Sequence, residues 1–301
     1  MNANLNELRG GAIAINKPSG MTSHDVVGAI RKLFHTRKVG HTGTLDPMAT
    51  GVLVVLVGRA VKACDLVMSS EKSYVAEMKL GITSDTEDIS GKLVYTGAPI
   101  PKRDDVISTA LSFLGESMQV PPMYSALKVG GKKLVDLARQ GIEIEREPRP
   151  ITIYSISAEG DGDTYSLDVT CSKGTYIRTL CADIGKSLGC GAVMSALKRS
   201  TCGGFDIEDA YTIEQLTDMT DEERMNALSP CEKLFSSLQS VRLPNFYARL
   251  FKNGSEIYQH KIKTAFNMGD LLRVYDDDGF IAIGEVRDFD GKSAIKVKAF
   301  L

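Results

Sequence analysis

The sequence lacks the features that mark metal-binding, secreted and membrane proteins. Its 301 residues include only four histidines and six cysteines, and no two cysteines form a CxxC pair. The spacings of the cysteines match neither the usual zinc patterns nor a disulfide framework. We therefore expect reduced thiols in a cytoplasmic protein, and we expect no metal site.

Long hydrophobic runs are also absent. No apolar run approaches the roughly 20 residues that span a bilayer. Residues 1–15 lack the basic stretch and apolar core that mark a signal peptide. We therefore expect neither secretion nor membrane insertion. The length allows two domains, or one large domain with a small appendage.

The net charge is only −2, but the charges are unevenly distributed. Residues 1–50 carry six Lys and Arg against three Asp and Glu, whereas residues 205–223 carry eight acidic residues and no basic one. Charge runs are usually solvated faces without a special function, and charge alone favours that interpretation. The alternative is a basic surface that faces RNA phosphates, with the acidic residues on another side.

Helical and strand patterns alternate irregularly over the first 230 residues or so. Strand patterns cover residues 11–15, 51–58, 73–81, 150–158 and 164–171. Helical patterns begin after Thr22 or Ser23 and also cover residues 104–114, 132–140 and 177–188. With hairpin-like connections, this order predicts an α+β fold with a mixed, mainly antiparallel sheet rather than a doubly wound parallel sheet.

After the acidic stretch the pattern changes to short β-rich runs. Asn253-Gly254, residues 276–279 and Asp290-Gly291 separate these runs, and each predicts a hairpin. We therefore divide the chain into a large domain of residues 1–234 and a small C-terminal β-barrel domain of residues 235–301.

The run KVGHTGTLDPMATG at residues 38–51 is the most informative segment. It is a loop rich in glycine and threonine that places Asp46 before a proline and a buried strand. Gly51 permits a backbone geometry that a side chain would obstruct. Asp46-Pro47 alone is more often a simple turn, so these residues by themselves do not establish a site. The spacing of a phosphate-binding P-loop is absent.

This loop and five further blocks closely resemble the signature of the bacterial tRNA pseudouridine-55 synthases. The further blocks are residues 16–23, 73–74 with 81–88, 119–128, 171–180 and 197–201. They follow the family's order, and the resemblance is strongest over residues 11–205. It implies a catalytic domain of the pseudouridine synthase type, an RNA-binding insertion at about residues 120–150, and a C-terminal barrel of the PUA type.

The resemblance also implies the reaction. Such an enzyme is an isomerase that converts uridine 55 in the T loop of tRNA to pseudouridine. The conversion changes no oxidation state, so it implies no cofactor. The implied partner is the T arm of tRNA, with no obligatory protein partner and no membrane, and the expected state is a monomer.

Residue roles follow from the same resemblance. Asp46 is the implied nucleophile, and Arg178 is the arginine that keeps it ionised. Tyr74 is placed to stack on the target base and to relay a proton, while Tyr176 and Leu197 line the pocket. Periodicity alone leaves structural alternatives, because Tyr74 shares a strand face with apolar residues and Arg178 lies at a helix start.

Access to a uridine within a folded loop requires base flipping. By resemblance, His41 fills the vacated stack, and Lys17 and Pro18 help to shape the site. Basic residues of the insertion are expected to fold over the RNA arm.

Three other functions stay open at this point. A guide-RNA-dependent synthase shares the catalytic core, but that group is typically longer and has basic tails. A tRNA-binding folding factor is compatible with an intact Asp46 if chaperoning is an additional activity. A glycoside hydrolase would need a second carboxylate, and the sequence places none evidently beside Asp46.

Overall fold

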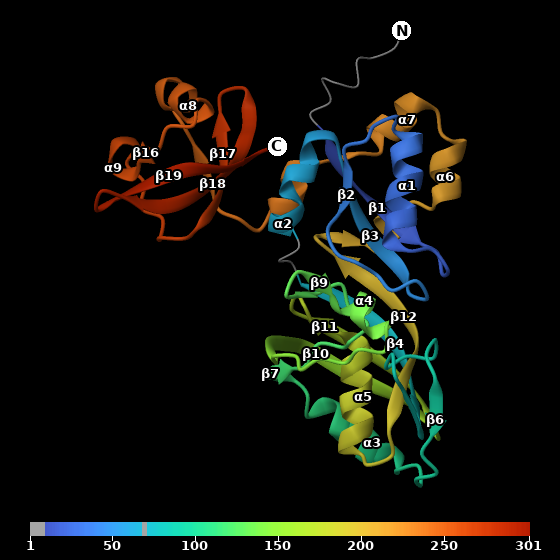
Figure 1. Ribbon diagram of the computed structural model, residues 1–301. Coiled ribbons are helices and arrows are strands. Elements are labelled where there is room, and N and C mark those ends of the chain that lie inside the picture. The colour runs from blue at the N-terminus through green and yellow to red at the C-terminus, as the bar shows by residue number, and fades with distance from the viewer. Residues whose placement is uncertain (1–9, 68–70) are drawn as a thin grey trace.

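The computed structural model describes residues 10–67 and 71–301, so residues 1–9 of the expected first domain lie outside the described residues. A large α+β body holds most of the chain, and a smaller β-rich body follows at the C-terminus (Figure 1). Among the described helices, none is long and apolar enough to cross a membrane.

Ten strands of the described residues form the large sheet, in the order β14-β1-β3-β12-β4-β11-β10-β7, with β2 beside β3 and β13 beside β12. They are β1 (Gly11–Lys17), β2 (Val39–His41), β3 (Thr50–Val57), β4 (Lys72–Leu80), β7 (Gly115–Gln119), β10 (Arg149–Asp161), β11 (Thr164–Cys171), β12 (Ala192–Cys202), β13 (Phe205–Asp206) and β14 (Ser229–Pro230). These described neighbours pair antiparallel except β3 and β12, which run parallel. The predicted mixed, mainly antiparallel sheet is confirmed.

Three helices cover one face of this sheet: α1 (Ser23–Leu33), α3 (Arg103–Leu111) and α5 (Ile177–Ser187). Thr22 caps α1 and exchanges hydrogen bonds with Asp25, the capping box that fixes where a helix begins. Strand alternation supplies the other half of this core, since Ile13 and Ile15 of β1 face the helices while Ala12 and Ala14 face the opposite side.

The opposite face carries a second apolar cluster under short helices. These are η2 (Gly58–Ala63), α2 (Cys64–Val67) and η4 (Cys231–Phe235). The acidic segment forms η3 (Ile207–Asp209), α6 (Ile213–Asp218) and α7 (Asp221–Asn226). Helix α6 packs beside α1 at the outer edge (Figure 1).

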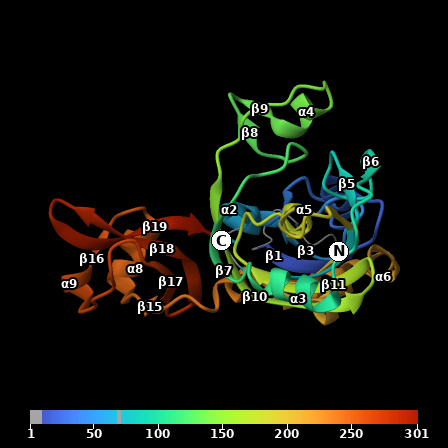
Figure 2. The ribbon, with the colours of Figure 1, turned by 90° about the horizontal axis from the view of Figure 1, so that it is seen from below.

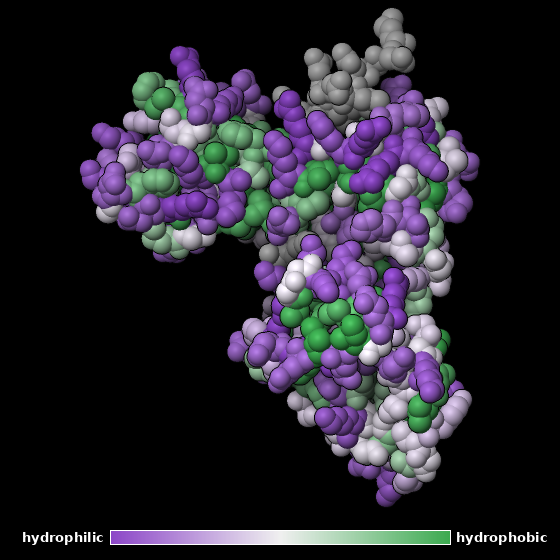
Figure 3. Space-filling model, viewed as in Figure 1, coloured by the Kyte–Doolittle hydropathy of each residue, from purple (hydrophilic) through white to green (hydrophobic). Residues whose placement is uncertain are grey.

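Two small hairpins project from the large sheet. One joins β5 (Ile82–Ser84) to β6 (Leu93–Tyr95), and the other joins β8 (Lys128–Val129) to β9 (Lys132–Lys133), followed by α4 (Leu134–Ala138). Figure 2 shows β8, β9 and α4 standing away from the body as a separate lobe. The lobe has a core of its own around Met123, Leu134 and Leu137, and apolar side chains also gather on its surface (Figure 3).

The C-terminal body is a five-stranded sheet of the described residues, ordered β15-β17-β18-β19-β16. Its elements are β15 (Ser240–Arg242), α8 (Asn245–Lys252), β16 (Ile257–Tyr258), α9 (Gln259–Ile262), β17 (Leu271–Asp276), β18 (Gly279–Phe289) and β19 (Lys292–Phe300). The described strands form an open path from β15 to β16, so the expected barrel is a curled half-barrel sheet.

The three turn signals of this region had different outcomes. Hairpins occur at residues 276–279 and at Asp290-Gly291, as predicted. The hairpin predicted at Asn253-Gly254 is wrong, because Asn253 is the C-cap of α8 and Gly254 follows it at φ +84°. A left-handed glycine ends helices as readily as it closes hairpins.

The two bodies share an apolar contact. Ile283 of β18 is fully buried in the cluster behind the large sheet, together with Leu56, Ala60 and Phe235. The C-terminal sheet therefore covers part of the core of the large body.

Candidate active site

A cavity of about 870 Å³ opens where the loop after β2 meets β4, β12 and the start of α5. Five of the residues predicted for the site line it: Asp46, Tyr74, Tyr176, Arg178 and Leu197. Segments that are far apart in the sequence thus meet at one place.

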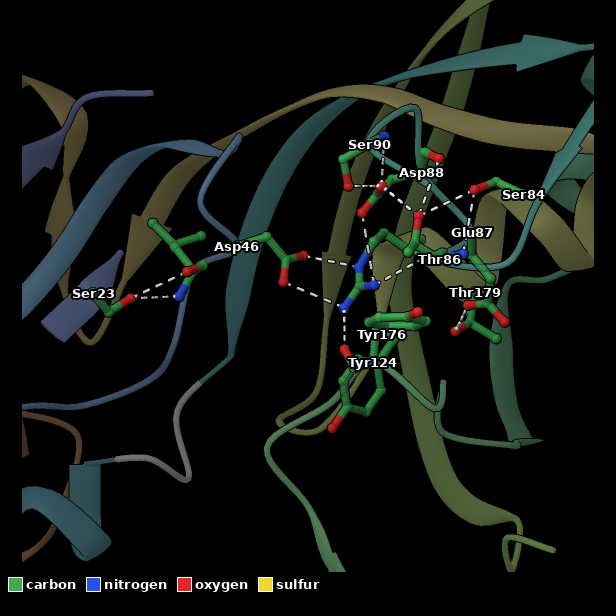
Figure 4. Close-up of polar contacts among 12 residues, drawn as sticks. Ser23, Asp46, Ser84, Thr86, Glu87, Asp88, Ser90, Tyr124, Tyr176 and Thr179 are labelled. Atoms are coloured by element: carbon green, nitrogen blue, oxygen red, sulfur yellow. Dashed lines mark hydrogen bonds and ion pairs between the residues drawn. The ribbon is translucent and has the colours of Figure 1, made fainter. Parts of the chain in front are cut away.

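Hydrogen bonds on both sides hold Asp46 in its loop. Ser23 accepts a hydrogen bond from the Leu45 amide at 2.9 Å and donates to the Leu45 carbonyl at 3.2 Å (Figure 4). The Pro47 carbonyl accepts from the Gly20 amide at 2.8 Å and from Lys17 Nζ at 3.1 Å. The turn that precedes α1 therefore fixes the backbone of the Asp46 loop.

Arg178 binds the Asp46 carboxylate with two donors. Its Nε lies 2.9 Å from Oδ2, and its Nη2 lies 3.3 Å from Oδ1. The Arg178 side chain is 5% exposed, whereas that of Asp46 is 31% exposed and faces the cavity. This fork geometry fixes the orientation of the carboxylate as well as its charge.

Arg178 also makes two hydrogen bonds to backbone carbonyls and a second ion pair. Nη1 donates to the Thr86 carbonyl and Nη2 to the Tyr124 carbonyl, each at 2.9 Å. Asp88 Oδ2 lies 3.7 Å from Nη1, and the side chain of Asp88 is itself buried. The guanidinium therefore lies between two carboxylates and bonds the insertion through Tyr124 (Figure 4).

Burial sets the direction of the Asp46 pKa. Removal of the carboxylate from water raises its pKa above the usual carboxyl value, Arg178 opposes this rise, and Asp88 adds to it. The buried charge of Asp46 is therefore stabilised chiefly by Arg178.

Two phenols complete the wall of the cavity. Burial raises the pKa of Tyr74 to about 12, and it also raises the pKa of Tyr176. Both side chains therefore keep their protons at neutral pH. Gln119 holds the Tyr176 backbone by accepting from its amide at 2.8 Å and donating to its carbonyl at 3.0 Å. Leu197 pairs in register with Ala76 across the sheet and supplies an apolar wall.

Three predicted residues are not among those that line the cavity. His41 is half-buried, its Nδ1 accepts from the Gly43 amide at 3.3 Å, and its ring lies edge-on to His24. Lys17 is fully buried and donates to the carbonyls of Pro18, Met21 and Pro47. Pro18 is exposed. Lys17 thus fixes the turn that supports Asp46.

Burial also governs the charge of these bases. It lowers the pKa of His41, with further lowering by His24 and Arg199, so the imidazole favours its neutral form. It lowers the pKa of Lys17 to about 8, against the attraction of Asp46.

Sequence reasoning missed Arg199, whose side chain is 1% exposed at the base of the cavity. Its Nε donates to the Val52 carbonyl at 2.7 Å, and its Nη2 donates to the Gly43 carbonyl at 3.3 Å. Gly51 lies against the same residue at φ +98°, where a Cβ atom would come within 2.2 Å of the Arg199 carbonyl. That close approach is the reason for the glycine at this position.

Sequence reasoning also assigned no role to Asp88, Tyr124 and Lys72. The signature blocks at residues 81–88 and 119–128 contain the first two, but no periodicity marks a functional residue within a loop. Among residues 10–67 and 71–301, no three histidine, cysteine, aspartate or glutamate side chains gather so that they could hold a metal ion.

This arrangement has a defined chemical capacity. An ionised carboxylate is oriented by a guanidinium at the edge of a cavity whose walls are two protonated phenols and an aliphatic side chain. It suits attack by a carboxylate on an electrophilic carbon of a flat ligand, with the aromatic walls placed for stacking.

Comparisons with known proteins identify the family of the chain. The model of the TruB family pseudouridylate synthase N-terminal domain matches residues 31–177, and that of the tRNA pseudouridylate synthase B C-terminal domain matches residues 178–236. The chain is 47% identical over 284 residues to tRNA pseudouridine synthase B of Clostridium kluyveri, covering 94% of this chain and 97% of that protein. It is 40% identical to the protein of the same name from Aromatoleum aromaticum, covering 96% and 91%.

Solved structures give the same picture of the fold. A Cbf5-Nop10-Gar1 complex contains a chain that matches with a TM-score of 0.75 at 28% identity, covering 97% of this chain and 84% of the other. An H/ACA RNP bound to a substrate RNA containing 2'-deoxyuridine gives a TM-score of 0.74 at 26% identity, covering 97% and 85%. The chain belongs to the TruB family of pseudouridylate synthases and is an isomerase.

Proposed function

We propose that this protein converts uridine 55 in the T loop of tRNA to pseudouridine, with Asp46 as the nucleophile. The observation that carries the proposal is the paired Asp46 carboxylate, which Arg178 holds at 2.9 and 3.3 Å at the edge of a cavity. The names of the relatives, tRNA pseudouridine synthase B, support tRNA as the substrate.

The reaction breaks a glycosidic bond, turns the uracil and rejoins it through carbon. Asp46 attacks the uridine as the bond between C1′ and N1 breaks, and it is released again when C5 of the uracil has bonded to C1′. The proton displaced from C5 is lost while N1 gains one, so the product is an isomer of the substrate. Arg178 keeps the Asp46 carboxylate ionised and fixes its orientation. Tyr74 stacks on the uracil and holds a proton at its hydroxyl, in keeping with a pKa of about 12. Tyr176 and Leu197 confine the detached base, so that it rotates without escaping. The reaction needs no cofactor.

RNA access is the second part of the proposal. The uridine flips out of the T loop, and neutral His41 takes part of its place in the stack. The lobe of residues 120–150 closes on the T arm, and its exposed cations contact phosphates. These cations are Lys128, Lys132, Lys133, Arg139 and Arg149. Lys17 and Pro18 act indirectly, through the turn that supports the Asp46 loop.

We further propose that residues 1–234 form the catalytic domain and residues 235–301 a PUA-like domain that binds RNA beyond the T arm. The described elements of the second domain begin with β15 at Ser240, which supports a boundary close to residue 235. The protein acts in the cytoplasm as a monomer, without a guide RNA or an obligatory protein partner. The higher identity to the tRNA synthases than to the chains of the RNP structures supports this choice.

The test is pseudouridine mapping of unmodified tRNA before and after incubation with the purified protein alone. We expect one new pseudouridine, at position 55. Modification only after a guide RNA is added would favour the guide-dependent class, and a different position would reject the proposed substrate site.

A further inference from the structure

The segment between β5 and β6 grips Arg178 at two points. The carbonyl of Thr86 accepts from Arg178 Nη1 at 2.9 Å, and the carboxylate of Asp88 lies 3.7 Å from the same nitrogen. Glu87 is the residue between them, and it takes no part in either contact.

The side chain of Glu87 bonds the neighbour of Arg178 instead. Glu87 Oε2 accepts a hydrogen bond of 2.5 Å from the hydroxyl of Thr179, which is 5% exposed in the first turn of α5 (Figure 4). Three consecutive residues, 86–88, therefore hold two consecutive residues, 178 and 179. Any shift of this segment would move Arg178 relative to Asp46.

The backbone of Glu87 has a strained conformation. Its φ of +63° lies in the left-handed region, which costs a non-glycine residue about 1–2 kcal/mol. The strain is held by its neighbours, since the Glu87 carbonyl accepts from the Met194 amide at 3.1 Å and its amide donates to the Ser84 carbonyl at 3.2 Å. Glycine or asparagine would adopt this conformation more easily, so the glutamate side chain itself is the feature to explain.

Glu87 does not line the cavity that contains Asp46. It lines a separate cavity of about 460 Å³, together with Thr83, Thr96 and Lys186. A carboxylate on that side of the segment cannot touch a base bound against Asp46, so its influence on the reaction is indirect.

We propose that Glu87 is a positioning residue. Its hydrogen bond to Thr179 fixes the segment of residues 86–88 relative to α5, and so holds the Arg178 guanidinium in the orientation in which it binds Asp46. This inference rests on the proposed function, because it concerns how the Asp46–Arg178 pair is held. Loss of the hydrogen bond between Glu87 and Thr179 should therefore slow the chemical step and leave RNA affinity unchanged.

The experiment compares single-turnover pseudouridine formation at saturating tRNA, and tRNA affinity, in five variants. Glu87→Ala removes the acceptor of the hydrogen bond from Thr179, and Glu87→Gln keeps an amide oxygen that can accept it. Glu87→Asn tolerates the backbone conformation but is too short to reach. Thr179→Val removes the donor from the other side with nearly unchanged shape, and the fifth variant combines Glu87→Ala with Thr179→Val.

We expect Glu87→Ala, Glu87→Asn and Thr179→Val each to slow the chemical step about tenfold or more, with tRNA affinity within about twofold. Glu87→Gln should keep most of the wild-type rate, because its amide oxygen still accepts from Thr179. The double variant should be no slower than either single variant, because Glu87→Ala and Thr179→Val remove the same hydrogen bond. Full rates for Glu87→Asn or Thr179→Val, additive losses in the double variant, or losses confined to affinity would each overturn the inference.

The wild-type protein and Asp46→Asn separate this inference from the proposed function. Wild-type protein that forms no pseudouridine would reject the function. An active wild type, an inactive Asp46→Asn and an unimpaired Thr179→Val would reject only the role of Glu87. Thr179→Val also decides the matter if the Glu87 variants do not fold.

Discussion

The guanidinium of Arg178 meets the carboxylate of Asp46 as a fork, with Nε 2.9 Å from Oδ2 and Nη2 3.3 Å from Oδ1. The two residues lie 132 positions apart in the chain. Because the fork is planar and fixed, it controls where the carboxylate points as well as its charge. The first prediction follows from this geometry.

Arg178→Lys should lose about 100-fold in the single-turnover rate, because an ammonium keeps the charge but cannot make both bonds, and charge-assisted bonds contribute about 1.5–3 kcal/mol each. Arg59→Lys, at an exposed arginine that does not line the cavity, is the matched control and should be nearly as active as wild type. A lysine at position 178 with near-normal turnover would mean that charge alone matters.

The rate should fall on the acid side with a midpoint above the usual aspartate pKa of about 3.9, because burial raises the pKa of Asp46 and only its ionised form attacks. Protonation of Asp46 should have the opposite effect on the stability of the fold. A raised carboxyl pKa means that the folded protein binds a proton more readily than the unfolded chain, so the stability cost of the charged Asp46 disappears as the pH falls through this pKa. A rate–pH profile measured with an isolated T-arm hairpin checks the prediction for the rate, and a flat acid limb down to about pH 4 would contradict it.

Lys17→Met should lower both stability and rate. The substitution keeps the length of the buried chain but removes the Nζ donor from the carbonyls of Pro18 and Met21, at a cost of about 1–3 kcal/mol for each carbonyl left unsatisfied, while the Pro47 carbonyl keeps only the Gly20 amide. Loss of the bond to the Pro47 carbonyl loosens the loop that carries Asp46. Urea unfolding and single-turnover rates measure the two effects, with exposed Lys38→Met as the control. Unchanged stability would show that the carbonyls find other partners.

The RNA-binding role of the C-terminal sheet is best tested by reversing a surface charge. Deletion of the sheet would expose the core cluster of the large body in which Ile283 is buried. Lys261→Glu reverses an exposed charge on α9 and should weaken the binding of full tRNA more than that of an isolated T-arm hairpin. A higher salt concentration should reduce this difference in affinity. Equal effects on both RNAs would show that this face does not bind RNA beyond the T arm.

Local features of the fold could be predicted because local forces determine them. The capping box of Thr22 and Asp25 marks the start of α1, and the alternation of residues 73–81 marks a strand with one buried face. Asn253-Gly254 was misread because a left-handed glycine serves both a hairpin and a helix end, and only the tertiary context distinguishes them.

The site was predictable to a different extent. Asp46, Tyr74, Tyr176, Arg178 and Leu197 lie together as the family resemblance implied, although no local pattern could have paired residues so far apart. Glu87, Asp88 and Arg199 escaped notice, because burial of a charged side chain depends on distant carbonyls and carboxylates. Lys17 shows the same limit, since its three acceptors come together only in the folded chain.

The central claim is that Asp46 carries the reaction. Asp46→Asn keeps the shape of the side chain and removes the nucleophile, so single-turnover assays at saturating tRNA should show no pseudouridine at position 55, while tRNA affinity stays within about threefold of wild type. Substantial pseudouridine formation by this variant would contradict the account.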